Sequence, residues 1–111
     1  MKRIDVPIAL WDGTMSTEPG YEVPETNGTM AVHRALHGSD WRLTHIQTGR
    51  GFSSFALTSR ADGIAAARCL FRACQRLGVD LRRRRKGFKG AQQKALMKAC
   101  ARWCRPLRPI A

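Results

Sequence analysis

The side chains with the most distinctive chemistry form a cationic run near the carboxy-terminal end of the sequence. Residues 82–86 read Arg-Arg-Arg-Arg-Lys, and Lys89 follows after Gly87 and Phe88. Neighbouring like charges repel one another unless counterions or phosphates neutralise them. The side chains expected to contact phosphate are Arg82, Arg83, Arg84, Arg85, Lys86 and Lys89. The alternative interpretation is a solvated linker between two helices.

Phe88 lies inside this cationic loop, where an aromatic ring has two uses. It could stack on an exposed base, as aromatic side chains do in single-strand-binding proteins, or it could pack into the hydrophobic core. The tetrapeptide Gly87-Phe88-Lys89-Gly90 also resembles the GxxG loop with which KH domains clamp a nucleic-acid backbone. A helix precedes that loop in KH domains, whereas a run of charges precedes it here.

Four cysteines raise the question of a metal site. They are Cys69, Cys74, Cys100 and Cys104, and no two of them form a CxxC pair. In a helix, a spacing of five residues directs Cys69 and Cys74 to opposed faces, with Cys74 inward and Cys69 toward the basic back. We therefore expect free, mostly buried thiols, and neither a metal nor another cofactor.

Three histidines fall in or beside a predicted hairpin, namely His33, His37 and His45. Neither a serine, a cysteine nor a carboxylate stands near them at a spacing typical of a nucleophile or an acid–base pair. We expect no catalytic residue, so the sequence predicts a protein that is not an enzyme. The catalytic alternative is a metal-free nuclease.

The positive charge is distributed unevenly along the chain. Lysine and arginine number 20 against 8 acidic residues, which gives a net charge of +12. Residues 1–28 carry two basic and five acidic side chains, whereas residues 81–111 carry eleven basic and no acidic ones. Such a charge destabilises a compact domain unless an anionic partner relieves it. No apolar stretch reaches the length of a membrane span, so we expect no membrane partner.

Two helices are expected to position these cations. Residues 60–77 show helical periodicity, with Ser59 and Asp62 suited to the amino-terminal cap and Gly78 to the carboxy-terminal one. One side of this helix is apolar, and the other gathers Arg68, Arg72, Gln75 and Arg76. A second helix is expected over residues 91–104, before Pro106. Its predicted phosphate-binding ridge consists of Lys94, Lys98, Arg102 and Arg105, opposite Leu96, Ala99, Cys100 and Trp103.

Strands are expected ahead of the first helix. Residues 29–36, 41–48 and 52–57 are rich in strand-forming side chains and are separated by turn sequences. Residues 1–28 are acidic and interrupted by proline and glycine, which indicates an arm or an edge strand. The predicted fold is α+β: a small antiparallel sheet of three or four strands, one packed helix and a basic amphipathic carboxy-terminal helix. With 111 residues it forms a single domain, in which residues 78–90 are a basic loop and 91–111 a basic helix and tail.

Part of the chain resembles known DNA-binding domains. The segment Trp41-Arg-Leu-Thr-His-Ile46, the Gly51-Phe52 turn exit and the alanine-rich segment 58–68 are similar to the ethylene-response-factor domain and to the arm-binding domains of phage integrases. In those families arginines on a three-stranded sheet enter the major groove. The resemblance therefore implies Arg34, Arg42 and Arg50 as base contacts. It covers residues 29–77 and lacks the families' first-strand glycine. The order of strands and helix also resembles double-stranded-RNA-binding domains without their first helix.

These observations favour a non-catalytic nucleic-acid-binding protein that contacts phosphates through its carboxy-terminal third, with DNA preferred over RNA. A phage or mobile-element origin fits such a protein. The alternative is a small protein-interaction inhibitor of a host defence or nucleic-acid machine, which binds a host protein or a nucleoprotein complex. Pro7 and Asp5 interrupt any apolar signal-peptide region, so we expect a cytoplasmic, reducing location.

Overall fold

The computed structural model describes residues 1–35, 40–52, 57–85 and 90–103, with the backbone alone at residues 97 and 99–103. Its elements are β1 (Arg3–Ala9), β2 (Met15–Glu22), β3 (Met30–Arg34), β4 (Trp41–His45), α1 (Arg60–Arg76) and α2 (Gly90–Trp103). The strands form one antiparallel sheet in the order β1-β2-β3-β4. The predicted α+β class is confirmed, with four strands in the sheet. No helix in the described ranges is long and apolar enough to cross a membrane.

The amino-terminal residues form a long hairpin. Strands β1 and β2 pair from Arg3 opposite Tyr21 to Ala9 opposite Met15. The connecting turn is closed by Asp12, whose carboxylate accepts hydrogen bonds from the amide and the hydroxyl of Thr14. An arm is therefore the wrong interpretation of this acidic segment. Its outer strand β1 does lie at the edge of the sheet, as the edge-strand alternative expected.

The sheet has two chemically different faces. Residues directly opposite each other in an antiparallel pair lie on the same face, and neighbours along a strand alternate. Val32 pairs with Leu43 on the face covered by α1, which we call the helix face. His33 pairs with Arg42 on the other side, which we call the open face.

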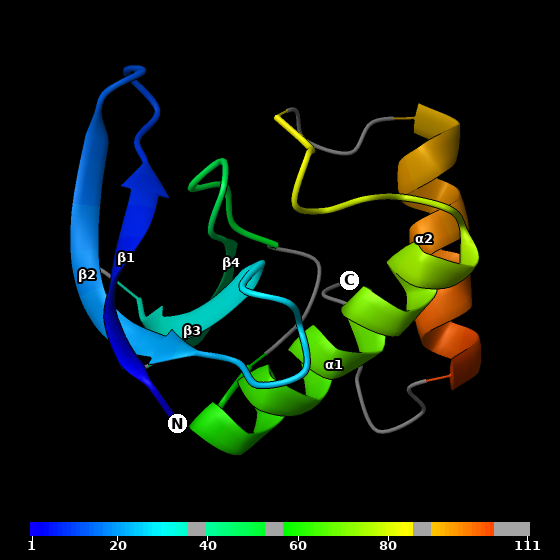
Figure 1. The fold of residues 1–111 in the computed structure, drawn as a ribbon, viewed down its shortest axis with the longest axis horizontal. Helices are drawn as coiled ribbons and strands as arrows, with labels where there is room; N and C mark the ends of the chain where they lie inside the picture. Colours follow the sequence, from blue (N-terminus) through cyan, green and yellow to red (C-terminus); the bar gives the residue numbers. More distant parts are fainter. Residues whose placement is uncertain (36–39, 53–56, 86–89, 104–111) are drawn as a thin grey trace.

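Helix α1 packs closely on the helix face because its contacting residues are small (Figure 1). A methyl group added at Gly63 would lie 2.8 Å from a γ-carbon of Val32, and the buried alanines Ala66, Ala67 and Ala73 continue the same surface. Ser59 caps the helix by accepting a hydrogen bond from the amide of Asp62. Gly78 follows its end with φ of +71°, so the predicted caps are confirmed.

Helix α2 packs on α1, on the side away from the sheet (Figure 1). Leu96 is buried in the same hydrophobic core as Leu70 of α1 and Leu43 of β4. The third predicted strand falls mainly on residues 53–56, outside the described part. At its ends Gly51 forms a single bridge with Thr44, and the carbonyl of Leu57 accepts a hydrogen bond from the Trp41 amide.

Candidate nucleic-acid interface

The arginine run, Arg82 to Arg85, belongs to a segment that is fixed to the rest of the protein on both sides. The preceding residue, Leu81, is 3% exposed and belongs to the hydrophobic core. Upstream, the Val79 amide donates to the carbonyl of Cys74, and Asp80 accepts from the Arg82 amide. Downstream, the guanidinium of Arg84 donates a 2.6 Å hydrogen bond to Gln92 of α2. The described part of the predicted basic loop is therefore held in place on both sides, and its exposed arginines are also compatible with the alternative of a solvated linker between two helices.

A buried histidine attaches this segment to the sheet. Nε2 of His45 lies 2.6 Å from the carbonyl oxygen of Leu81, and Nδ1 lies 2.8 Å from the hydroxyl of Thr48. A carbonyl oxygen only accepts, so Nε2 carries the proton and the Thr48 hydroxyl donates to Nδ1. Burial lowers the pKa of His45 below its usual 6.5, and the positive charges of Arg84 and Arg85 lower it further. The ring is therefore neutral at pH 7.

The cations around this anchor point into solvent. Arg82, Arg83 and Arg85 are exposed and Arg84 is half-buried. Arg83 forms a 3.7 Å ion pair with Asp80, but its side chain remains 90% exposed. On α2, Lys94 and Lys98 are exposed while Leu96 is buried, as the predicted amphipathic pattern requires. The first turn of α2 contains no acidic residue, so no carboxylate of that turn competes for these cations.

The back of α1 adds further positive charge. Arg72, Gln75 and Arg76 are exposed, as expected. Arg68 is half-buried and forms a 3.5 Å ion pair with Glu25 of the loop after β2. The prediction for Cys69 was wrong, because its side chain is buried and not on the basic back.

Not every predicted contact residue belongs to one surface. Arg42 lies on the open face, opposite His33, whereas Arg34 pairs with Trp41 on the helix face and stacks over its ring at 5.3 Å. Arg50 is exposed in the loop after β4. The three arginines implied by the resemblance therefore do not form one base-reading row. The other predicted phosphate contacts, Lys86, Lys89 and the side chains of Arg102 and Arg105, lie outside the described residues.

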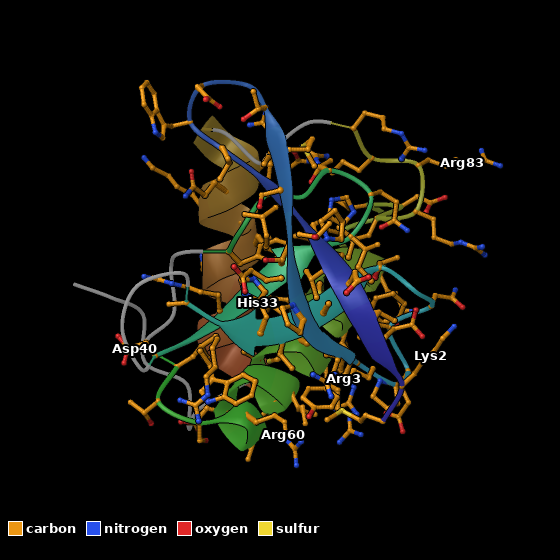
Figure 2. The ribbon with its side chains drawn as sticks, turned by 90° about the vertical axis from the view of Figure 1, so that its left-hand side faces the viewer. Lys2, Arg3, His33, Asp40, Arg60 and Arg83 are labelled. Carbon is orange, nitrogen blue, oxygen red and sulfur yellow. The ribbon has the colours of Figure 1, made fainter. Side chains whose placement is uncertain are left out.

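The open face contains a polar pair that sequence reasoning missed. His33 is 4% exposed, and its Nε2 lies 2.8 Å from the hydroxyl of Thr44 while its Nδ1 lies 2.8 Å from the carbonyl of Arg34. In Figure 2 it lies behind the hairpin strands, near the middle of the molecule. Burial lowers its pKa below 6.5, against an opposing effect of the Glu18 charge. Only the strand register, which places His33 and Thr44 on one face, could have revealed this pair.

The cysteines differ from expectation, because a disulfide removes two thiols. Cys69 is disulfide-bonded, so the prediction of four free thiols is wrong. Its partner is not among the described side chains. Cys74 is buried in the core, as predicted for an inward-facing residue of α1. Within the described ranges, no three residues of the histidine, cysteine or carboxylate types gather where they could hold a metal ion.

Comparison with known proteins assigns this chain to no family. No family model matches the chain, and neither a curated protein nor a solved structure is significantly similar to it.

Proposed function

We propose that this protein binds nucleic acid without catalysis, by holding phosphates against the arginine run and the exposed lysines of α2. One observation carries the proposal: four consecutive arginines stand on a segment fixed by a buried leucine, a histidine–carbonyl hydrogen bond and a bond to α2. Arginines held in place lose less conformational freedom on binding than arginines of a flexible tail. Their planar guanidinium groups suit phosphate oxygens.

The location of these cations separates them from other basic residues. Arg83 and Arg60 lie at opposite ends of the molecule in Figure 2. Arg60 stacks over the ring of Tyr21 at 4.9 Å, next to the amino-terminal end of the chain. The proposed surface consists of Arg82, Arg83, Arg84, Arg85, Lys94 and Lys98.

Salt dependence of binding tests this proposal. Each phosphate neutralised on duplex DNA contributes about −0.9 to the slope of log affinity against log salt, so six contacts predict a slope of about −5. Binding to a labelled DNA duplex, measured by fluorescence anisotropy between about 50 and about 300 mM salt, gives that slope. An RNA duplex of the same sequence then tests the preference for DNA.

Two charge-matched triple variants locate the surface. Arg82→Ala, Arg83→Ala and Arg85→Ala together should reduce the slope to about −2 or −3, because three contacts are lost. The control combines Lys2→Ala, Arg3→Ala and Arg60→Ala, which removes the same charge at the other end of the molecule. The control should retain nearly the full slope. Equal weakening by both triples would show that only net charge matters, and wild-type protein without affinity for either duplex would refute the proposal.

A protein-interaction role is the second candidate, and one observation favours it. Trp11 at the tip of the β1–β2 hairpin is 98% exposed, and Met15, the first residue of β2, is 57% exposed. Tryptophan is enriched among residues that dominate protein interfaces. A tagged protein that captures one protein from a host lysate after nuclease treatment, and loses it on Trp11→Ala, would support this role over the first.

The proposed function places the protein inside a cell, where nucleic acid is found. Cytosolic thiols are normally reduced, so the disulfide of Cys69 would not persist there. Binding measured with and without dithiothreitol should give the same affinity if the arginine run alone determines it.

A further inference from the structure

The open face of the sheet is closed into a cup by an unusual contact. The amide of Ala9, at the end of β1, donates a 2.8 Å hydrogen bond to the carbonyl of Gly49, in the loop after β4. Gly49 has φ of +69°, and a methyl group there would lie 2.9 Å from the Ala9 nitrogen. The first strand and the loop after the last one therefore meet, and the sheet curls around its own open face.

The cup forms a cavity of about 310 Å³ that is open to solvent on one side. Its walls are Ile8 and Ala9 on one side and Gly49 and Gly51 on the other. His33 and Thr44 also line it. This volume is at the lower end of the range for small-molecule sites, and the mixture of apolar walls with a few polar groups is typical of them.

Arg42 supplies the only full positive charge that lines this cavity among the described residues. Its side chain is exposed, and neither a carboxylate nor another described group forms an ion pair or hydrogen bond with it. Its charge nevertheless reaches His33, whose protonation it opposes. A cation at the rim of a concave, partly apolar site concentrates anions there.

The floor of the cavity adds oriented hydrogen-bonding groups. Nδ1 of His33 must carry the proton, because it faces the carbonyl of Arg34, and the Thr44 hydroxyl then donates to Nε2. The lone pairs of the Thr44 oxygen remain available to accept a hydrogen bond from a ligand. Burial lowers the pKa of His33, and the carboxylate of Glu18, on the same face, acts on that ring as well, so Arg42 must outweigh one nearby negative charge to hold an anion.

We infer that this cavity binds a small organic anion, with a carboxylate or phosphate on Arg42 and a compact, partly apolar body against Ile8 and Ala9. The inference is independent of the proposed nucleic-acid surface, because the arginine run contacts the sheet through His45 of the helix face. A free metabolite and the terminal phosphate of a nucleic acid offer the same chemistry, and the choice of probes separates them.

Nuclear magnetic resonance titration tests the inference. The probes are acetate, inorganic phosphate, adenosine monophosphate and a 5′-phosphorylated dinucleotide, each followed through the amides of the cavity and the side-chain Nε of Arg42. We expect millimolar or tighter binding of at least one probe, with shifts centred on residues 42–44 and 49–51. A dinucleotide that binds more tightly than the mononucleotide would identify a nucleic-acid end as the source of the anion.

Matched variants separate this site from general attraction of anions. Arg42→Gln should weaken binding at least about tenfold, because it removes the charge that faces the ligand. Arg50→Gln removes the same charge from a residue that does not line the cavity, and it should change affinity less than about twofold. The Arg82/Arg83/Arg85 alanine triple should bind the small probes normally, so failure of the nucleic-acid proposal leaves this result unaffected. Equal effects of the two glutamine variants, shifts confined to the arginine run, or no binding of any probe would overturn the inference.

Discussion

The two buried histidines of the sheet show how the same side chain is used differently on its two faces. His33 and His45 lie on adjacent strands, both are nearly inaccessible to solvent, and each pairs one ring nitrogen with a threonine and the other with a backbone carbonyl. The two histidines differ in where the bonded carbonyl lies in the sequence. His33 bonds to the neighbouring Arg34, within its own strand, whereas His45 bonds to Leu81, 36 residues away. Burial alone therefore does not identify a role, because one ring orders a cavity floor and the other fixes a distant segment.

Replacing each histidine with alanine should have the largest effect on stability, and the two losses should differ. His45→Ala leaves the Leu81 carbonyl and the Thr48 hydroxyl buried without their partner, and we expect a loss of about 3 kcal/mol in the free energy of unfolding. His33→Ala opens onto the cavity, where water can replace the ring, so we expect only about 1.5 kcal/mol. Urea denaturation at neutral pH gives both values. A larger loss for His33 would show that the open face, and not the helix face, supports the fold.

Disrupting the contact between Ala9 and Gly49, which closes the cup, should have the next largest effect on stability. Gly49→Ala forces a side chain into the left-handed region and into the Ala9 backbone, and it should cost about 2 kcal/mol. Gly51→Ala is the control, because its new methyl group would meet only the Leu43 carbonyl, at an ordinary 3.7 Å. Thermal melting of both variants checks the difference. Equal melting temperatures would mean that β1 does not need this contact.

The pH dependence of stability sharpens the comparison further. Both histidines have lowered pKa values, chiefly through burial, so between the folded value and the unfolded 6.5 the unfolded chain binds more protons. Their contribution to stability is complete above about pH 6.5 and is lost as the pH falls below it, by about 1.4 kcal/mol for each unit of pKa difference. Urea denaturation at about pH 7.5 and about pH 5 measures this loss, and replacing either histidine with glutamine should reduce it. A loss unchanged in both variants would assign it to other groups.

The smallest effect concerns only the position of two protons. The hydrogen-bond partners place the proton on Nδ1 of His33 and on Nε2 of His45, which are opposite tautomers. Nitrogen chemical shifts of the imidazole rings distinguish them directly at neutral pH. Two rings of the same tautomer would contradict one of the two carbonyl hydrogen bonds.

The sequence allowed some parts of this structure to be predicted because their signals are local. Ser59 and Asp62 are three residues apart, and Gly78 directly follows the last turn, so the limits of α1 follow from chemistry within the helix itself. The alternation of Leu96 with Lys94 and Lys98 similarly predicted which side of α2 is buried.

Other parts depend on contacts between distant residues. The strand β2 contains Pro19 and Gly20, which usually indicate a turn, and it is a strand because β1 and β3 pair with it. The candidate surface was predicted as a set of charges, but its attachment through Leu81 and His45 joins residues whose separation in sequence carries no pattern. The cavity was likewise not predictable, since its walls come from β1 and from the loop after β4, at the two edges of the sheet.

The contact between Ala9 and Gly49 also bears on how the chain behaves at high concentration. Unpaired strand edges are templates on which other chains add strands and aggregate. Here β1 carries Pro7, which cannot donate to a neighbour, and its end is bonded to Gly49, while β4 is covered on its outer side by bonds from Phe52 to Leu43 and from Trp41 to Leu57. The end of β1 and the outer side of β4 are thus shielded along the described chain. We therefore expect strand addition at these places to be disfavoured, and the high net charge opposes it further.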